Sequence, residues 1–187
     1  SLIMQNCDVI IKLIDEIIEV CKLNNMISAA AINEDDVVEI GRKVLKAMEP
    51  LAQRGVRLRI DCPSTPVKIY TDSSKLQQLL TNLLGNACKF TAQGSIILSI
   101  KEDAEYVTFS VADTGCGIPK DERDKLFKRY SKLSEIKHGT GLGLYICNEI
   151  AKQLNSRIYI NPDCCDGSEF VFEHAKNLKS IIDRNQV

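Results

Sequence analysis

A pair of strands in the middle of the chain is the feature that most constrains the fold. SIILSIK (95–101) and YVTFSVAD (106–113) are rich in β-branched and aromatic residues, and only a short acidic turn separates them. Four more short segments read as strands: VRLRID (56–61), KIYT (68–71), RIYIN (157–161) and SEFVFEH (168–174). VRLRID alternates apolar and charged residues, which is the period of a half-buried strand. The chain therefore builds a β-sheet.

Helical patterns lie before and between these strands. Residues 3–23 read as one long helix whose apolar stripe is wide enough for a helical bundle. Further helices are expected from Asn33 as N-cap to about Gln53, from Asp72 as N-cap through the segment TNLLGNACKF, near 119–129 with Pro119 in the first turn, and from about Gly141 to Leu154. This order predicts an α+β fold: a two-layer sandwich of helices on one face of a mixed β-sheet, preceded by one long helix.

Charge and hydropathy exclude several classes of function. Lys plus Arg total 24 against 25 for Asp plus Glu, so no general positive field favours nucleic acid, and we expect no nucleic-acid partner. No apolar run approaches the length needed to cross a bilayer, and the first residues lack the features of a signal peptide. We expect a cytoplasmic domain, although the full-length protein could be anchored to a membrane.

The eight cysteines do not form a recognisable framework. Their spacing is irregular and contains no CxxC motif, and Cys164 and Cys165 are adjacent, which strains a disulfide bond. Cys88 and Cys147 fall within helical apolar patterns, where a free thiol packs as a small hydrophobic group. We expect all eight to be reduced thiols and expect no cysteine metal site.

Two amides stand one turn apart in the otherwise apolar helical segment TNLLGNACKF (81–90). Asn82 and Asn86 lie at i and i+4, so they share one face of the helix. Burial of a primary amide without a hydrogen-bond partner is costly. Either they are satisfied core amides or end caps, or both point into a polar cavity and hold a ligand there.

The segment DTGCGIP (113–119) directly follows a predicted strand. Gly115 and Gly117 remove side chains where the backbone turns tightly, and they allow a flat ligand to approach closely. Asp113 is placed to accept a hydrogen bond from an exocyclic amine such as that of adenine. A simple turn with aspartate and glycine as turn formers is the structural alternative.

A second glycine-rich segment, GTGLGL (139–144), opens the last predicted helix. Its glycines expose backbone N–H groups at a helix N-terminus, where phosphate oxygens bind readily. The segment is neither a Walker loop nor a dinucleotide fingerprint, because it lacks GKS/T and no strand leads straight into it.

These motifs together, in this order, resemble the GHKL ATP-binding fold of histidine kinases, type II topoisomerases, mismatch-repair ATPases and a large heat-shock chaperone family. The detailed resemblance is to sensor histidine kinases. LQQLLTNLLGNACKFT looks like their N box, DTGCGIP their G1 box, LFKRY their F box and GTGLGL their G2 box, and LIDEIIEV resembles the end of their second dimerisation helix.

The resemblance implies a role for the amides and their neighbours. The residue matching Asn86 coordinates Mg²⁺, for which a neutral amide oxygen is a suitable hard ligand, and the residue matching Asn82 lies beside the phosphates. Lys89 would meet phosphate charge, and Phe90 would lie against the nucleotide. We therefore expect ATP and Mg²⁺ as cofactors.

The resemblance also implies the remaining contacts. Asp113 takes the adenine amine, and Gly115, Gly117 and Ile118 shape the base pocket. The connection from 127 to 138 looks like the mobile ATP lid, with Lys132 as a third catalytic group beside Asn82 and Lys89. The phosphate-cradling turn comprises Gly139, Thr140, Gly141, Leu142 and Gly143. Tyr130 and Ser131 depart from the aromatic pattern that is usual in the lid.

Histidine kinases also need an acceptor histidine on their first dimerisation helix. This chain has two histidines, His138 and His174, and neither lies in such a helix. The expected function is therefore to present the γ-phosphate of Mg-ATP to an acceptor histidine outside this chain, for two-component signalling. Expected partners are the protein's own dimerisation domain, a homodimer partner and a response regulator or receiver domain.

The resemblance divides the chain into three parts. Residues 1–28 are the end of the dimerisation region and a linker, 29–175 the ATP-binding catalytic domain and 176–187 a tail. Two alternative functions remain: a degenerate nucleotide-sensing or dimerisation scaffold without phosphotransfer, and an ATPase that drives a clamp. The clamp would need an acidic general base near Asn82, where this sequence has Gln77 and Gln78.

Overall fold

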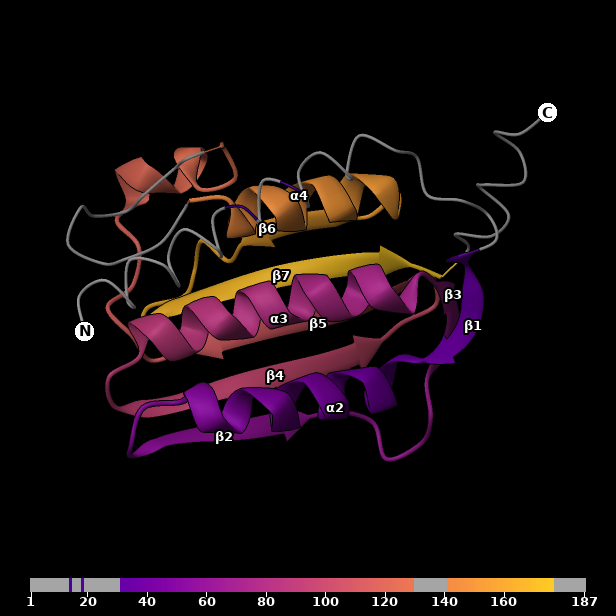
Figure 1. Cartoon of the computed structure of the whole chain (residues 1–187), viewed down its shortest axis with the longest axis horizontal. Helices are drawn as coiled ribbons and strands as arrows, with labels where there is room; N and C mark the ends of the chain where they lie inside the picture. Colours follow the sequence, from indigo (N-terminus) through magenta and orange to yellow (C-terminus); the bar gives the residue numbers. More distant parts are fainter. Residues whose placement is uncertain (1–13, 15–17, 19–30, 130–140, 177–187) are drawn as a thin grey trace.

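The computed structural model describes residues 14, 18, 31–129 and 141–176, and it shows helices packed on one face of a β-sheet (Figure 1). Ile14 and Ile18 are helical, as predicted, and the rest of the expected N-terminal helix lies outside the described residues. Within the described part of the chain, no helix is long and apolar enough to cross a membrane.

The main sheet has five strands in the order β2-β4-β5-β7-β6. Its strands are β2 (Val56–Asp61), β4 (Gly94–Glu102), β5 (Tyr106–Asp113), β6 (Arg157–Ile160) and β7 (Ser168–Ala175). β2 pairs with β4 in parallel, and the other neighbouring strands pair antiparallel. The predicted mixed sheet is confirmed, and the expected strand pair is the hairpin of β4 and β5 at its centre.

Three helices cover one face of this sheet: α2 (Val37–Met48), α3 (Ser73–Phe90) and α4 (Gly143–Gln153) (Figure 1). Side chains alternate between the two faces of a strand, and in β5 the buried row is Val107, Phe109, Val111 and Asp113. Phe109 contacts Phe172 of β7, with 5.8 Å between ring centroids. Asp113 therefore ends the strand on the same side as the apolar core.

The predicted start of the second helix is wrong. Residues Asn33–Asp36 form a strand, β1, that pairs antiparallel with β3 (Lys68–Thr71) in a small two-stranded sheet. Asp36 is the helix cap instead of Asn33, because one carboxylate oxygen accepts from the Val38 N–H at 3.0 Å and from the Val67 N–H at 3.2 Å. That second bond, to a residue 31 positions away, joins the helix start to the small sheet.

Other element ends differ from the predictions by a few residues. Asp72 caps α3 as predicted and accepts from the Lys75 N–H at 3.1 Å. α2 ends at Met48 rather than near Gln53, since Pro50 has no N–H to continue the helical hydrogen bonds and a 3-10 turn, η2 (Glu49–Leu51), follows. The short helix after Pro119 is a 3-10 helix, η3 (Lys120–Lys125).

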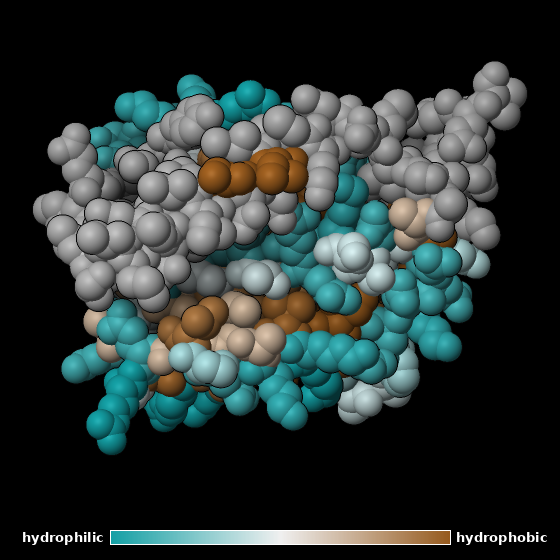
Figure 2. All heavy atoms as spheres, in the orientation of Figure 1, coloured by the Kyte–Doolittle hydropathy of each residue, from teal (hydrophilic) through white to brown (hydrophobic). Residues whose placement is uncertain are grey.

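The six cysteines in the described residues are free thiols, and Cys88 and Cys147 are buried among apolar side chains as predicted. On the helical face, hydrophobic side chains reach the surface along the seam between α2 and α3, while much of the described surface around it is hydrophilic (Figure 2). Leu51, which follows α2, is 61% exposed.

Candidate active site

Asp113 stands at the end of β5 with its carboxylate held by backbone donors. The Gly115 N–H donates to it at 2.8 Å, and the Ser168 N–H donates to it from β7, where Ser168 is the register partner of Asp113. Burial raises the pKa of the Asp113 carboxyl above its usual value, and these two N–H groups counter part of that shift. The side chain is 7% exposed, so it is a fixed acceptor at the edge of the core.

The loop after Asp113 is closely packed on both sides, and glycine is required for that packing. A Cβ at Gly115 would lie 2.5 Å from the Phe90 carbonyl oxygen, and a Cβ at Gly117, where φ is +69°, would lie 3.1 Å from the Gly167 carbonyl oxygen. Gly167 itself has φ +72°, and a Cβ there would lie 1.9 Å from the Asp113 carbonyl oxygen. The loop is thus held between the end of α3 and the β6–β7 connection.

The last two turns of α3 carry the polar residues predicted from the sequence. Asn86 is half-buried, and no hydrogen bond to its amide is found among the described residues. Lys89 lies with its Nζ 4.8 Å from the centre of the Phe90 ring. The four residues Asn82, Asn86, Lys89 and Phe90 therefore follow one another along the C-terminal half of α3, which ends beside Gly115.

Asn82 meets the start of α4. A Cβ built at Gly143, the first residue of α4, would lie 4.0 Å from Asn82 Cγ, which is an ordinary van der Waals distance, so the Asn82 amide lies next to the start of α4. The Asn82 Nδ2 group is shielded from solvent without a hydrogen-bond partner of normal geometry in the described ranges. Burial raises the pKa of the adjacent Cys147 thiol to about 12, and a weak interaction with the Asn82 side chain counters part of this shift. An unsatisfied buried donor is unusual and needs an explanation such as a ligand.

The N-terminus of α4 supplies the second feature of an anion site. Gly141 has φ +74° and Leu142 is buried, which turns the chain sharply into the helix that begins at Gly143. The free N–H groups at a helix start favour negative charge. Among the predicted phosphate-binding residues, Gly139, Thr140 and Lys132 lie outside the described residues, as does His138.

The structure places Gly115 against the carbonyl of Phe90 at the end of α3, Asn82 against Gly143 at the start of α4, and the Gly115 N–H on the carboxylate of Asp113 at the end of β5. The other described candidates, Asn86, Lys89, Gly117, Gly141 and Leu142, are close neighbours of these residues in the sequence. Ile118 is half-buried and packs against the core at the end of the loop 114–118, called the glycine loop below. Phe127, in the predicted F box, makes an edge-to-face contact with Phe170 of β7, with 6.4 Å between centroids. This contact fixes the start of the predicted lid to the sheet.

Sequence reasoning missed the contribution of the β6–β7 connection. Gly167 and Ser168 contact Asp113 directly, from a segment more than fifty positions downstream. The available signal was the dipeptide Gly-Ser immediately before the strand SEFVFEH, because a glycine next to a strand marks close backbone approach. Only the pairing of β5 with β7 shows that Gly167 approaches the backbone of Asp113.

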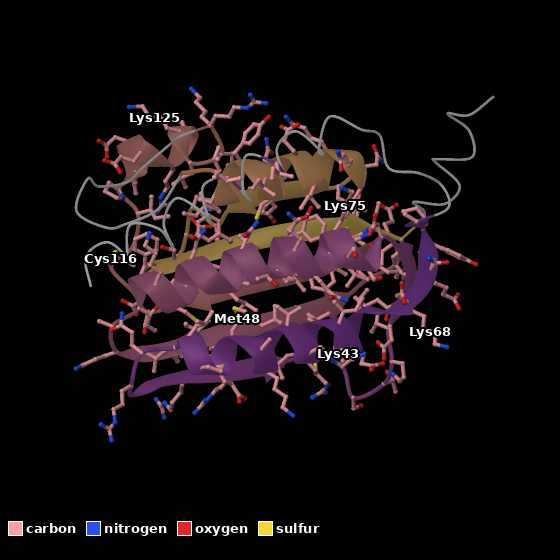
Figure 3. The ribbon with its side chains drawn as sticks, viewed as in Figure 1. Lys43, Met48, Lys68, Lys75, Cys116 and Lys125 are labelled. Atoms are coloured by element: carbon pink, nitrogen blue, oxygen red, sulfur yellow. The ribbon has the colours of Figure 1, made fainter. Side chains whose placement is uncertain are left out.

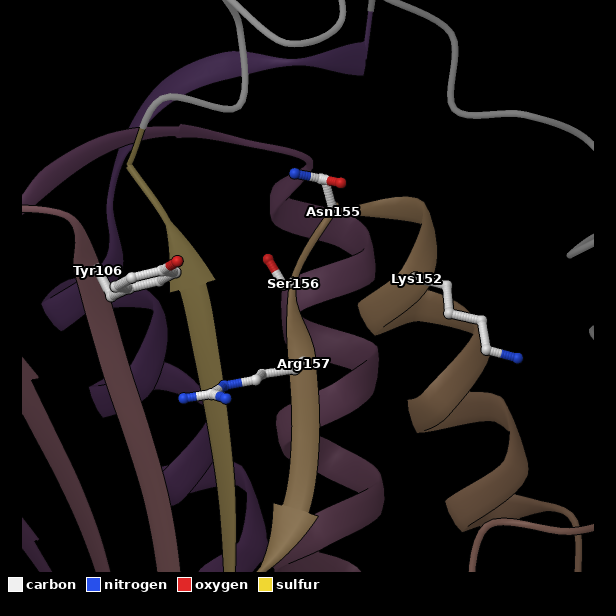
Figure 4. A pocket seen from close by; sticks show the side chains of 5 residues that line it. All are labelled: Tyr106, Lys152, Asn155, Ser156 and Arg157. Atoms are coloured by element: carbon white, nitrogen blue, oxygen red, sulfur yellow. The ribbon is translucent and has the colours of Figure 1, made fainter.

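A depression lies at the other end of β5 from Asp113 and has different chemistry (Figure 4). It has a volume of about 400 Å³ and is lined by Tyr106, Lys152, Asn155, Ser156 and Arg157. Tyr106 begins β5 and Asp113 ends it, so roughly 23 Å separate the two sites. Lys152 pairs with Glu149 at 2.7 Å and Arg157 pairs with Glu173, so both cations have carboxylate partners.

Comparisons with known proteins identify the family of the chain. The family model for histidine kinase-, DNA gyrase B- and HSP90-like ATPases matches residues 71–177. The aerobic respiration control sensor protein ArcB of Escherichia coli (strain K12) is 34% identical over 140 residues, which is 70% of this chain and 18% of that protein. The sensor histidine kinase RcsC of the same strain is 32% identical over 168 residues, which is 86% of this chain and 18% of that protein.

A solved structure shares the fold. The crystal structure of full-length ShkA in complex with AMPPNP superposes with a TM-score of 0.81 and 28% identity, over 91% of this chain and 36% of that one. The predicted fold is therefore confirmed. The chain spans about a fifth of the length of ArcB and RcsC.

Proposed function

Because the chain belongs to the family of histidine kinase-, DNA gyrase B- and HSP90-like ATPases, we propose that it is the ATP-binding catalytic domain of a sensor histidine kinase. In this role it presents the γ-phosphate of ATP to an acceptor histidine on another segment, for two-component signalling. The observation that carries the proposal is the buried carboxylate of Asp113, held by two backbone N–H groups beside a loop, residues 114–118, whose glycines pack directly against neighbouring backbone.

The base would lie against Asp113. Its carboxylate keeps acceptor capacity beyond the bonds from Gly115 and Ser168, and a carboxylate accepts from an exocyclic amine but not from a carbonyl. The backbone of Gly115 and Gly117 packs closely against the end of α3 and the β6–β7 connection, so a side chain at either position would displace the loop that borders the base. Ile118 and Phe90 supply apolar surface. This acceptor suits the exocyclic amine of adenine. Guanine also carries an exocyclic amine, so the choice of adenine rests on membership of the ATPase family.

The phosphates would lie between α3 and the start of α4. The buried Nδ2 group of Asn82 can donate a hydrogen bond to a phosphate oxygen there. Gly141, Leu142 and Gly143 lead into a helix N-terminus that favours anions. Lys89 would add a positive charge on the same side. Gly139, Thr140 and Lys132 are proposed to complete this site on the basis of the sequence motif.

Mg²⁺ would be held by the amide oxygen of Asn86, which has the hard oxygen donor that this ion prefers. The ion, when bound, supplies positive charge that neutralises the transferring phosphate. Asn86 is half-buried and makes no hydrogen bond with the described residues, so its oxygen is available. The protein's own contribution is positioning and electrostatic stabilisation.

His174 is unsuited to be the acceptor of the phosphate. It is fully buried in β7, and its Nε2 lies 2.8 Å from Thr71 Oγ1. We therefore propose that the acceptor lies on a dimerisation domain, to which residues 1–28 would belong, with 29–175 as the catalytic domain and 176–187 as a tail. A homodimer, a response regulator or receiver partner and a cytoplasmic location are part of the same proposal.

The test is nucleotide binding by the whole chain, measured by titration calorimetry with ADP and with Mg-ATP. Asp113→Asn should weaken both affinities by about tenfold or more, because a buried charged acceptor is lost. Asp61→Asn is the matched control, since Asp61 also ends a strand but is exposed. Equal affinities for parent and Asp113→Asn would refute the base pocket.

Phosphotransfer separates the kinase from a nucleotide-sensing scaffold. Added dimerisation helices that carry an acceptor histidine should become labelled from ATP with a labelled γ-phosphate. Nucleotide binding without any such transfer would favour the scaffold.

A further inference from the structure

Arg123 joins two segments that are distant in sequence. It is a half-buried residue of η3, and its Nε donates to the carbonyl of Ile118 at 3.2 Å while its Nη1 donates to the carbonyl of Pro162 at 3.1 Å. Ile118 ends the glycine loop, and Pro162 belongs to the β6–β7 connection. Arg123 forms no ion pair with the carboxylates of the described residues, so its contacts are with backbone.

The two segments that Arg123 joins are the two walls around Asp113. The glycine loop contributes the Gly115 N–H, and the β6–β7 connection leads to Gly167 and to the Ser168 N–H. Gly167 lies so close to the Asp113 backbone that a Cβ would overlap it. A relative shift of the two walls would therefore move the two donors that orient the Asp113 carboxylate.

We propose that Arg123 is a positioning residue for the base pocket, and this inference rests on the proposed function. Its planar guanidinium holds several N–H groups in a fixed fork, so one side chain sets the separation of two carbonyls. A lysine ammonium is a single point of donation and does not reproduce that fork. Arg123 acts on the base through Asp113 and does not itself contact the phosphates.

The experiment compares three variants of the whole chain: Arg123→Met, Arg123→Lys and, as control, Lys125→Met. Lys125 lies on the same short helix, is exposed and projects from its outer side, so its loss removes an equal charge without removing the two bonds (Figure 3). Arg123→Met should raise the Kd for ADP without Mg²⁺ by about five- to tenfold, and Arg123→Lys should recover only part of this loss. Lys125→Met should leave the Kd within about twofold, since exposed charges contribute little.

Two further measurements distinguish positioning from general stability. Amide hydrogen exchange at Gly115 and Ser168, measured without nucleotide, should become faster in Arg123→Met and stay unchanged in Lys125→Met. In phosphotransfer to a supplied acceptor, KM for ATP should rise while kcat stays near the parent value.

The outcomes are distinct. Unchanged exchange at Gly115 and Ser168, or faster exchange with an unchanged Kd, would overturn the positioning role. An equal loss in Lys125→Met would show a charge effect and would overturn it too. If the parent chain binds no adenine nucleotide, the proposed function fails, and the exchange rates alone then decide whether Arg123 holds the two walls together.

Discussion

Lowering the pH from 7.5 to 5 should destabilise the fold through His174. The ring is fully buried, its Nδ1–H donates to the Ala175 carbonyl at 2.9 Å, and its Nε2 accepts from the Thr71 hydroxyl at 2.8 Å. Burial lowers the pKa of His174 from 6.5 to about 4, and the bond to Ala175 counters part of that shift. The neutral ring therefore suits its site and the charged ring does not.

The sign of the effect follows from proton binding. Between pH 6.5 and pH 4 the unfolded chain binds a proton at His174 that the folded chain excludes, so stability falls as pH falls. A His174 pKa of about 4 in the folded chain, against 6.5 in the unfolded chain, corresponds to about 3 kcal/mol in the free energy of unfolding. About 2 kcal/mol of this stability is lost by pH 5. Above pH 7 the ring is neutral in both states and the effect vanishes.

The assay is urea unfolding of the parent and of His174→Gln at pH 7.5 and at pH 5. The carboxyl groups with lowered pKa, Asp103 and Glu173, are present in both proteins, so their contribution cancels in the difference. The parent should lose about 2 kcal/mol more than the variant between the two pH values. An equal pH dependence in both proteins would refute the reasoning.

Three further predictions concern the site. Gly115→Ala should weaken ADP binding at least tenfold, because the added methyl group would displace the Phe90 carbonyl and with it the loop beside Asp113. An unchanged calorimetric titration would contradict the close packing of the loop. Asn86→Ala should reduce phosphotransfer with Mg-ATP by at least tenfold and leave Mg²⁺-free ADP binding within about threefold; equal losses in both assays would make Asn86 a structural amide. Incubated with ATP labelled at the γ-phosphate, the chain alone should acquire no phosphohistidine at His174, which mass spectrometry of the labelled protein checks.

Local signals in the sequence were enough for much of the fold. The alternating segment VRLRID forms β2 with the predicted bounds, and YVTFSVAD forms β5. Asp72 caps its helix through a bond to a residue three positions away. These features depend on neighbours within a few residues, so periodicity and side-chain chemistry determine them.

The candidate site was predictable to the same extent. Asn82, Asn86 and Lys89 share one helix, and Asp113, Gly115 and Gly117 share one loop, so each group is visible as a motif. Their convergence was inferred from the resemblance to a family, and the packing of Gly115 against the Phe90 carbonyl gives that convergence its physical basis.

The tertiary structure alone decided the contacts between distant segments. The segment NEDD has a composition unsuited to strands, and it becomes β1 because β3 pairs with it and because Asp36 accepts from the Val67 N–H. Ser168 and Arg123 gained their places beside Asp113 and the glycine loop only through the pairing of β5 with β7 and the return of the β6–β7 connection. Such contacts carry no periodic signature, because their partners are set by the path of the whole chain and not by the residues on either side.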